Sequence, residues 1–176
     1  MKHIIKNDLN INKEDIEDEV TRIKVLLVNS HNQILVGYSH NCYQFIGGHK
    51  EKDEPLVDCL NREVLEEVGI FLNVSDVSPY LLLEHYCNDW PEMLEYINCK
   101  IYYFVIHTDL LPNLDKTKYT KEELEGNFKY EYIGIDKFRD SIINNYLKYD
   151  EAKTIGMEML MAFDIFMEDY NESINY

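Results

Sequence analysis

One short run dominates what this chain can fold into, the segment from Phe45 to Leu72, which reads FIGGHKEKDEPLVDCLNREVLEEVGIFL. Pro55 is a start signal for a helix and Gly69 is a stop signal, so the run predicts a helix over residues 55–68. Acidic residues crowd one part of this helix, and like charges three or four residues apart repel each other and weaken a helix. The chain must therefore compensate for these acids or leave them in water. They are Glu63, Glu66 and Glu67.

The crowded glutamates lie beside the apolar face of the predicted helix. At about 100° per residue they fall within an arc of roughly 100°, and the neighbouring arc is apolar and would face a core. Arg62 can pair with Glu66 or with an acid in the preceding loop, but one guanidinium cannot neutralise three carboxylates. Mg²⁺ and Mn²⁺ prefer oxygen ligands of this kind. The apolar arc comprises Leu56, Val57, Leu60, Val64 and Val68.

The same run resembles the Nudix box, whose signature is G-x5-E-x7-R-E-U-x-E-E-x-G-U, where U is a bulky aliphatic residue. Every specified position of the signature is filled in this chain. The order of strand, hairpin and loop around the box is also similar to that family, whereas the similarity weakens after about residue 100. The matching residues are Gly48, Glu54, Arg62, Glu63, Val64, Glu66, Glu67, Gly69 and Ile70.

The resemblance implies an α/β protein with the Nudix fold, in which a mixed β-sheet is sandwiched between helices. It also implies hydrolysis of a phosphoanhydride (pyrophosphate) bond in a nucleoside diphosphate linked to another moiety, with Mg²⁺ or Mn²⁺ as cofactor. Phosphoryl transfer needs its negative charge neutralised while a water is aligned for attack, which agrees with an acidic metal-binding cluster. The expected partner is therefore a small-molecule nucleoside diphosphate derivative.

The resemblance also implies metal ligands. Glu66 and Glu67 are expected to bind the metal, and Gly48 or its neighbour Gly47 is expected to contribute a backbone carbonyl. Because a glycine has no Cβ atom, its backbone can approach a ligand closely, so both glycines are also expected substrate contacts. Glu63 is expected to be a further metal ligand or to orient the catalytic water.

Other residues are expected to support the glutamates or to contact substrate. The resemblance implies that Arg62 holds the glutamates in place and that Glu54 pairs with Arg62. His49 follows the two glycines and could contact a phosphate, because a histidine ring titrates near neutral pH. Trp90 offers an aromatic face for stacking on a base, or packs at a strand end. Tyr86 lies where dinucleoside-polyphosphate hydrolases of this family often carry a tyrosine.

Many members of the family have a further glutamate outside the box, which completes the metal site or acts as a base. Each candidate here competes with the interpretation that it is an exposed surface acid. Glu123 is preferred because it lies in an expected loop just before a strand. The candidates are Glu84, Glu95, Glu122, Glu123 and Glu125.

Two positions depart from the pattern of many family members. Ile46 stands where a proline often precedes the two glycines, which changes loop rigidity but not the ligand set. After the second expected strand, where an arginine often reaches substrate, the chain reads Gly37-Tyr38-Ser39-His40. The usual phosphate contact is therefore missing from this place, and His40 or His49 could substitute for it.

The rest of the chain reads as one domain of strands and helices. Residues 1–20 are polar and predict an arm or a short helix, and residues 21–176 predict a single Nudix domain that includes C-terminal helices. The polar connection LPNLDKTKYTKEELEGN is a candidate substrate loop. The expected strands are 22–28, 34–38, 45–46, 80–86, 96–107 and 130–135, and the expected later helices are 136–149 and 151–170.

Composition excludes several classes of function. The formal charge of −16 argues against binding to duplex nucleic acid and leaves little surface for an RNA chain, because such binding needs clustered lysine and arginine. No apolar run approaches the ~20 residues that span a bilayer, and no apolar secretory signal is evident. The four cysteines form no CxxC pair. They predict reduced thiols in a cytoplasmic protein.

Two rival functions use the same kind of fold. A catalytically silent nucleotide-sensing or nucleotide-binding module would be expected to lose a box glutamate, and none is lost here. An isopentenyl diphosphate isomerase needs a catalytic Cys and Glu pair outside the box, and none can be assigned. The methionine-rich segment TIGMEMLMAFDIFMEDY predicts a core-packing helix, with a homodimer contact as the alternative.

Overall fold

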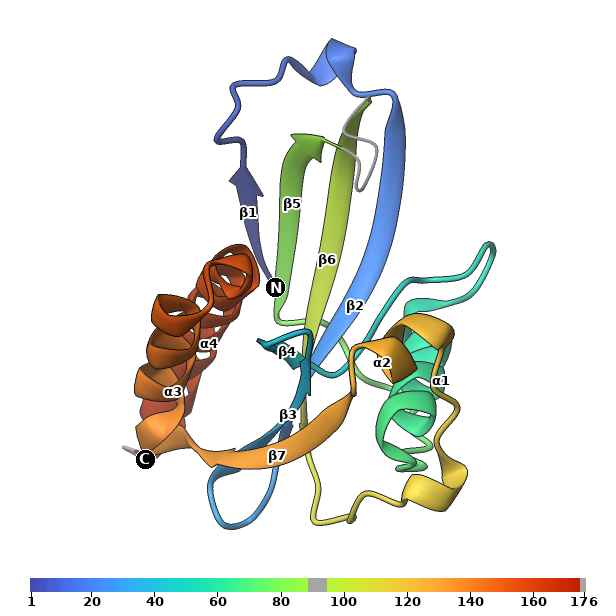
Figure 1. The fold of residues 1–176 in the computed structure, drawn as a ribbon, viewed down its shortest axis with the longest axis vertical. Coiled ribbons are helices and arrows are strands. Elements are labelled where there is room, and N and C mark those ends of the chain that lie inside the picture. The colour runs from blue at the N-terminus through green and yellow to red at the C-terminus, as the bar shows by residue number, and fades with distance from the viewer. Residues whose placement is uncertain (89–94, 175–176) are drawn as a thin grey trace.

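A mixed β-sheet with helices on both of its faces forms the framework of the protein (Figure 1). The computed structural model describes residues 1–88 and 95–174. Within these residues, seven strands form one sheet in the order β1-β5-β6-β2-β3-β4, and β7 pairs with β3. Helices α3 and α4 lie on one side of the sheet, and α1 and α2 lie on the other (Figure 1). The expected α/β architecture is confirmed.

The strands and helices of the described residues have the following bounds, given in chain order. The strands are β1 (Lys2–Lys6), β2 (Asp18–Val28), β3 (Gln33–Ser39), β4 (Cys42–Phe45), β5 (Leu81–Asn88), β6 (Tyr96–His107) and β7 (Lys129–Gly134). The helices are α1 (Leu56–Val68), α2 (Lys121–Glu125), α3 (Ile135–Lys148) and α4 (Lys153–Ile174). Short 3-10 turns lie at Lys13–Asp15, Leu114–Lys116 and Asp150–Ala152.

Strand β2 separates two hydrophobic clusters, one on each face of the sheet. Successive side chains of a strand point to opposite faces, so Ile23 and Val25 pack in the cluster that contains residues of α1. Leu26 and Val28 pack in the other cluster, with residues of α3 and α4. All four side chains are buried. This two-sided burial explains why the segment reads as a nearly continuous apolar run.

The first twenty residues differ from the expected arm or short helix. Strand β1 pairs in parallel with β5, in a register from Lys2 opposite Leu81 to Lys6 opposite His85. An edge strand with one neighbour buries little surface, and of this strand only Ile4 packs against the core. Its sequence therefore carries no clear apolar alternation. Residues 18–20, within the segment that predicted a short helix, belong to β2 because β6 pairs with this strand along its whole length.

Helices α3 and α4 lie close to the positions that the sequence predicted. Within α4, Met159, Leu160, Phe163 and Phe166 are buried in the cluster beside the sheet, so this methionine-rich helix packs in the core. The expected polar connection after β6 differs in one respect, because it contains the short helix α2 as well as a 3-10 turn. None of the helices among residues 1–88 and 95–174 has the length and apolar composition of a membrane span.

Phe138 of α3 joins this helix to both the sheet and α4. Its ring stacks on Phe45 with centroids 5.6 Å apart and on Phe163 with centroids 4.5 Å apart. Phe138 is fully buried. Removing the ring would therefore leave a cavity between three elements.

We expect Phe138→Ala to lower the free energy of unfolding by about 3–5 kcal/mol, because the lost ring contacts and the residual cavity both destabilise the fold. Urea denaturation measures this change. Leu147→Ala, on the same helix with 74% of the residue exposed, should change the same quantity by less than about 0.5 kcal/mol. Equal losses in the two variants would contradict the placement of α3.

Candidate functional site

Helix α1 carries the glutamates and is fixed at both ends by local signals. Pro55 is its N-cap in an extended conformation, and Gly69 is its C-cap at φ 68°, with an N–H that donates to the Leu65 carbonyl at 2.9 Å. A Cβ atom on Gly69 would also collide with the Asn113 carbonyl oxygen. Val64 and Val68 bury one face of the helix against the sheet. The acidic edge of α1 is therefore held beside the glycine loop.

The glycine loop runs alongside β2. The Val25 N–H donates to the Ile46 carbonyl at 2.9 Å, and the Ile23 N–H donates to the Gly48 carbonyl at 3.0 Å. A Cβ atom on Gly47, which has φ 127°, would collide with the Ile23 carbonyl. A Cβ atom on Gly48 would lie 2.5 Å from Oε2 of Glu63. Gly47 therefore requires glycine because the strand backbone approaches it closely, whereas a side chain at position 48 would displace the Glu63 carboxylate.

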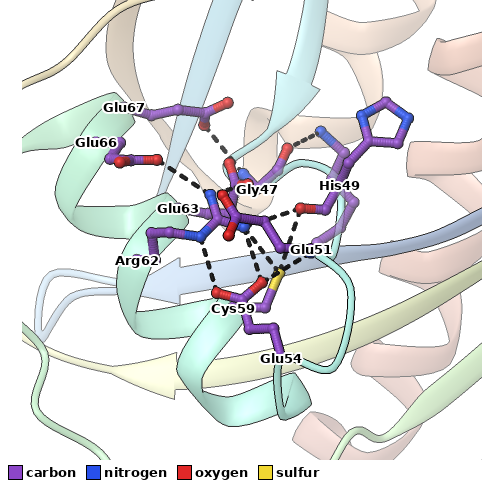
Figure 2. A network of polar contacts seen from close by, with 10 residues as sticks. Gly47, His49, Glu51, Glu54, Cys59, Arg62, Glu63, Glu66 and Glu67 are labelled. Carbon is purple, nitrogen blue, oxygen red and sulfur yellow. Dashed lines mark hydrogen bonds and ion pairs between the residues drawn. The ribbon is translucent and has the colours of Figure 1, made fainter.

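Arg62 lies at the centre of the polar network that joins α1 to this loop (Figure 2). Its guanidinium makes a bidentate pair with Glu54, Nε to Oε1 at 2.8 Å and Nη2 to Oε2 at 3.0 Å. Nη1 donates to Glu63 at 2.7 Å and to Glu66 at 3.1 Å. Nη2 also donates to the His49 carbonyl at 2.9 Å. One arginine thus neutralises part of the charge on three glutamates and fixes the loop.

The electrostatics of this network differ from one carboxylate to the next. Hydrogen bonds from Arg62 are the main reason that the pKa of Glu54 is lowered to about 2. The hydrogen bond with Glu54 is in turn the main cause that raises the pKa of Arg62. Burial raises the pKa of Glu63, although Arg62 opposes this effect. Glu54 is therefore held as an anion, while the charge on Glu63 is the costlier one to maintain.

Glu67 and Lys24 form hydrogen bonds with the two backbone polar groups of Gly47, its N–H and its carbonyl. The Gly47 N–H donates to Oε2 of Glu67 at 3.0 Å, and Glu67 is buried with 5% of its surface exposed. The ammonium of Lys24 donates to the Gly47 carbonyl at 2.5 Å and to the Phe45 carbonyl at 3.0 Å. Burial lowers the pKa of Lys24, Glu67 raises it, and Arg22 adds to the lowering. The sequence pointed to neither Lys24 nor Arg22.

The donor set on α1 fits a hard divalent cation in its chemistry. Glu63, Glu66 and Glu67 supply only oxygen ligands from one edge of one helix, as Figure 2 shows, and Mg²⁺ or Mn²⁺ favours such ligands. Among the side chains that the structure describes, no three from His, Cys, Asp or Glu converge closely enough to hold a metal ion as they stand. The glutamates must therefore rotate away from Arg62 and Gly47 to share a cation.

Several predicted residues lie elsewhere or are otherwise engaged. The carbonyl of Gly48 accepts a hydrogen bond from β2, and the ring of His49 accepts one from Arg22 at 3.0 Å. Tyr86 is buried on β5, opposite Asn98 of β6. Glu123 belongs to the short helix α2 and not to the expected loop, and its side chain lies outside the described part of the structure. Trp90 also lies outside the described residues.

Comparison with protein families places the site within a known domain. The family model described as NUDIX domain matches residues 16–143 of the chain. This range contains the glycine loop, α1 and every strand of the sheet except β1. No curated protein sequence matches the chain.

Solved structures show the same fold at low sequence identity. A MutT protein from Bacillus halodurans is 19% identical, with 69% of this chain and 72% of that chain covered and a TM-score of 0.52. A MutT Nudix hydrolase from Burkholderia pseudomallei is 17% identical, with 68% and 86% covered and a TM-score of 0.48. Sequence identities this low support a shared fold and nothing more. Of the two structures, the one from Bacillus halodurans supports that shared fold.

The Glu54–Arg62 pair predicts a pH dependence of stability. The pKa of Glu54 falls from its ordinary value of 4.5 to about 2 on folding, so its charge stabilises the fold above pH 4.5 and this contribution is lost as the pH falls toward 2. We expect Glu54→Gln to lower the free energy of unfolding by about 1.5–3 kcal/mol near neutral pH. Urea denaturation over a series of pH values should show this difference shrinking below about pH 4.5. A difference of constant size down to about pH 3 would contradict the pairing.

Proposed function

The chain belongs to the Nudix hydrolase family, and from this premise we propose that it is a metal-dependent pyrophosphohydrolase. Its substrate would be a nucleoside diphosphate linked to another moiety, and the reaction would cleave the phosphoanhydride bond. The observation that carries the proposal is the edge of α1, where Glu63, Glu66 and Glu67 lie beside the glycine loop. Their partial neutralisation by one arginine leaves net negative charge for a cation.

The three glutamates would hold Mg²⁺ or Mn²⁺, with a glycine-loop carbonyl as a further ligand. Such a cation supplies neutralisation of phosphate charge and lowers the pKa of a bound water. Glu66 and Glu67 are the proposed principal ligands, and Glu63 is a further ligand or orients the attacking water. Rotation of the glutamates toward the cation would exchange hydrogen bonds with Arg62 and Gly47 for metal contacts.

Arg62 and Glu54 would keep the acidic edge in place during this exchange. Their bidentate pair fixes the guanidinium independently of Glu63 and Glu66, because Nε and Nη2 face Glu54 while Nη1 faces the other two. Arg62 can therefore release either glutamate without losing its own position. Glu123, from the α2 region, stays a weaker proposal for an additional base.

The alternative function is a catalytically silent nucleotide-binding module with the same fold. The observation that favours it is the lack of three converging metal-binding side chains in the described part of the chain. The complete set of box glutamates favours the enzyme. The two functions differ in one measurable property, which is turnover.

A substrate panel with each metal tests the proposal. The panel contains nucleoside triphosphates, oxidised purine triphosphates, ADP-ribose, dinucleoside polyphosphates, nucleotide sugars and coenzyme A. We expect phosphate-containing products from at least one member with Mg²⁺ or Mn²⁺ and none in the presence of EDTA. Binding of a member without turnover by either metal would favour the silent module.

Glu66→Gln and Glu67→Gln should each lower the turnover of any substrate that the parent protein cleaves by about 100-fold or more, because each removes one metal-ligand charge. Asp58→Asn is a matched control, since Asp58 is an exposed acid on the same helix. This control should keep activity within about twofold of the parent. Full activity of either glutamine variant would exclude that residue as a metal ligand.

A further inference from the structure

Two cations on β2 reach the glycine loop that lies beside the glutamates of α1. The chain has 17 lysine and arginine residues against 33 acidic residues. Arg22 and Lys24 are two residues apart on one strand, and side chains with this spacing point to the same face of a sheet. This face is the one on which Leu26 and Val28 pack beside α3 and α4.

The ammonium of Lys24 is held at the glycine loop by backbone atoms. It donates to the carbonyls of Phe45 and Gly47, at 3.0 Å and 2.5 Å. An ammonium has three donors, so a third remains for a ligand oxygen. Lys24 also keeps part of its surface exposed. The charge is therefore fixed in position at the glycine loop.

The guanidinium of Arg22 lies on the same face of β2 and is held by the ring of His49. Its Nε donates to the ring Nε2 of His49 at 3.0 Å, and the backbones of these two residues form a β-bridge. A single hydrogen bond through Nε leaves both terminal nitrogens of the fork for an anion, and guanidinium groups bind phosphate in this way. Arg22 forms no salt bridge with any acid whose side chain the structure describes.

The end of β3 offers no competing cation. The segment Gly37-Tyr38-Ser39-His40 contains no arginine or lysine. Ser39 Oγ lies 3.0 Å from Nδ1 of His40, so this ring is engaged within its own turn. The end of β3 therefore supplies no lysine or arginine for phosphate recognition, whereas β2 carries two such residues beside the glycine loop.

We propose that Arg22 and Lys24 form the phosphate-binding half of the site and contact the diphosphate group of the substrate. This proposal rests on the proposed function, because it places the phosphates between the β2 cations and the cation held by α1. Gly47 lies between the acidic side and the basic side of the site, since Glu67 bonds to its N–H and Lys24 bonds to its carbonyl. Fixed positive charge on this side would offset the negative charge of the phosphates without bringing in water.

Binding of methylenediphosphonate tests the proposal without knowledge of the nucleoside. This probe carries two phosphonate groups joined through a methylene carbon, and hydrolysis does not cleave its P–C bonds. Isothermal titration with Mg²⁺ present compares the wild type with Arg22→Met and Lys24→Met. We expect each variant to weaken binding about tenfold or more, because each removes a charge-assisted hydrogen bond to the probe.

Lys100→Met is the matched control. Lys100 lies on the adjacent strand β6 opposite Thr21, on the other face of the sheet, and pairs with Glu19 at 2.5 Å. The Lys100→Met variant should bind the probe with an affinity within about twofold of the wild-type value. The Mn²⁺ affinity of Arg22→Met, measured without the probe by electron paramagnetic resonance, should also stay within about threefold of the wild-type value, because Arg22 is not a metal ligand.

The outcomes separate this proposal from the proposed function. Suppose that the wild type turns over a substrate of the panel, and that folded Arg22→Met and Lys24→Met bind the probe as tightly as the wild type does. This result would overturn the phosphate-binding role of Arg22 and Lys24, and the proposed enzymatic function would still hold. A wild type that neither binds the probe nor turns over any substrate would overturn both. If Lys24→Met fails to fold because the glycine loop loses its anchor, Arg22→Met alone decides, since Arg22 bonds to no loop carbonyl.

Discussion

The site depends first on the Arg62 guanidinium, because it makes a crowded row of glutamates compatible with a folded helix. Its donors reach Glu54 in the preceding loop and Glu63 and Glu66 on α1. Arg62 also holds the His49 carbonyl, so it joins the loop to the helix. The charge balance stays incomplete, and the remaining negative charge is what would attract a divalent cation. Stability and proposed function therefore rest on the same side chain.

The second constraint is the close approach of the glycine loop to β2. Gly47 and Gly48 lie where a Cβ atom would meet either a β2 carbonyl or the Glu63 carboxylate. This approach brings Glu67 of α1 to the N–H of Gly47 and Lys24 of β2 to its carbonyl. A substrate that carries phosphates and binds with a metal matches this alternation of charge, because each phosphate would meet positive charge on both sides.

The sequence predicted the parts of the fold that local rules control. Helix α1 is capped by Pro55 and Gly69, as predicted, because caps and helical periodicity act over a few residues. Strand β1 was not predicted, because it exists only through its pairing with β5, which is distant in the sequence. Lys24 was missed for a similar reason. A single lysine in an apolar strand gives no signal of the loop carbonyls that surround it, since these arrive from another part of the chain.

The central claim is that the glutamate edge of α1 is a cation site facing a phosphate site on β2. Anomalous scattering from crystals grown with Mn²⁺ and methylenediphosphonate tests this claim most directly. We expect a manganese peak bounded by the carboxylates of Glu63, Glu66 and Glu67, with a diphosphonate that reaches Lys24 and Arg22. A manganese peak away from α1, in a crystal of protein that hydrolyses its substrate in solution, would contradict the account.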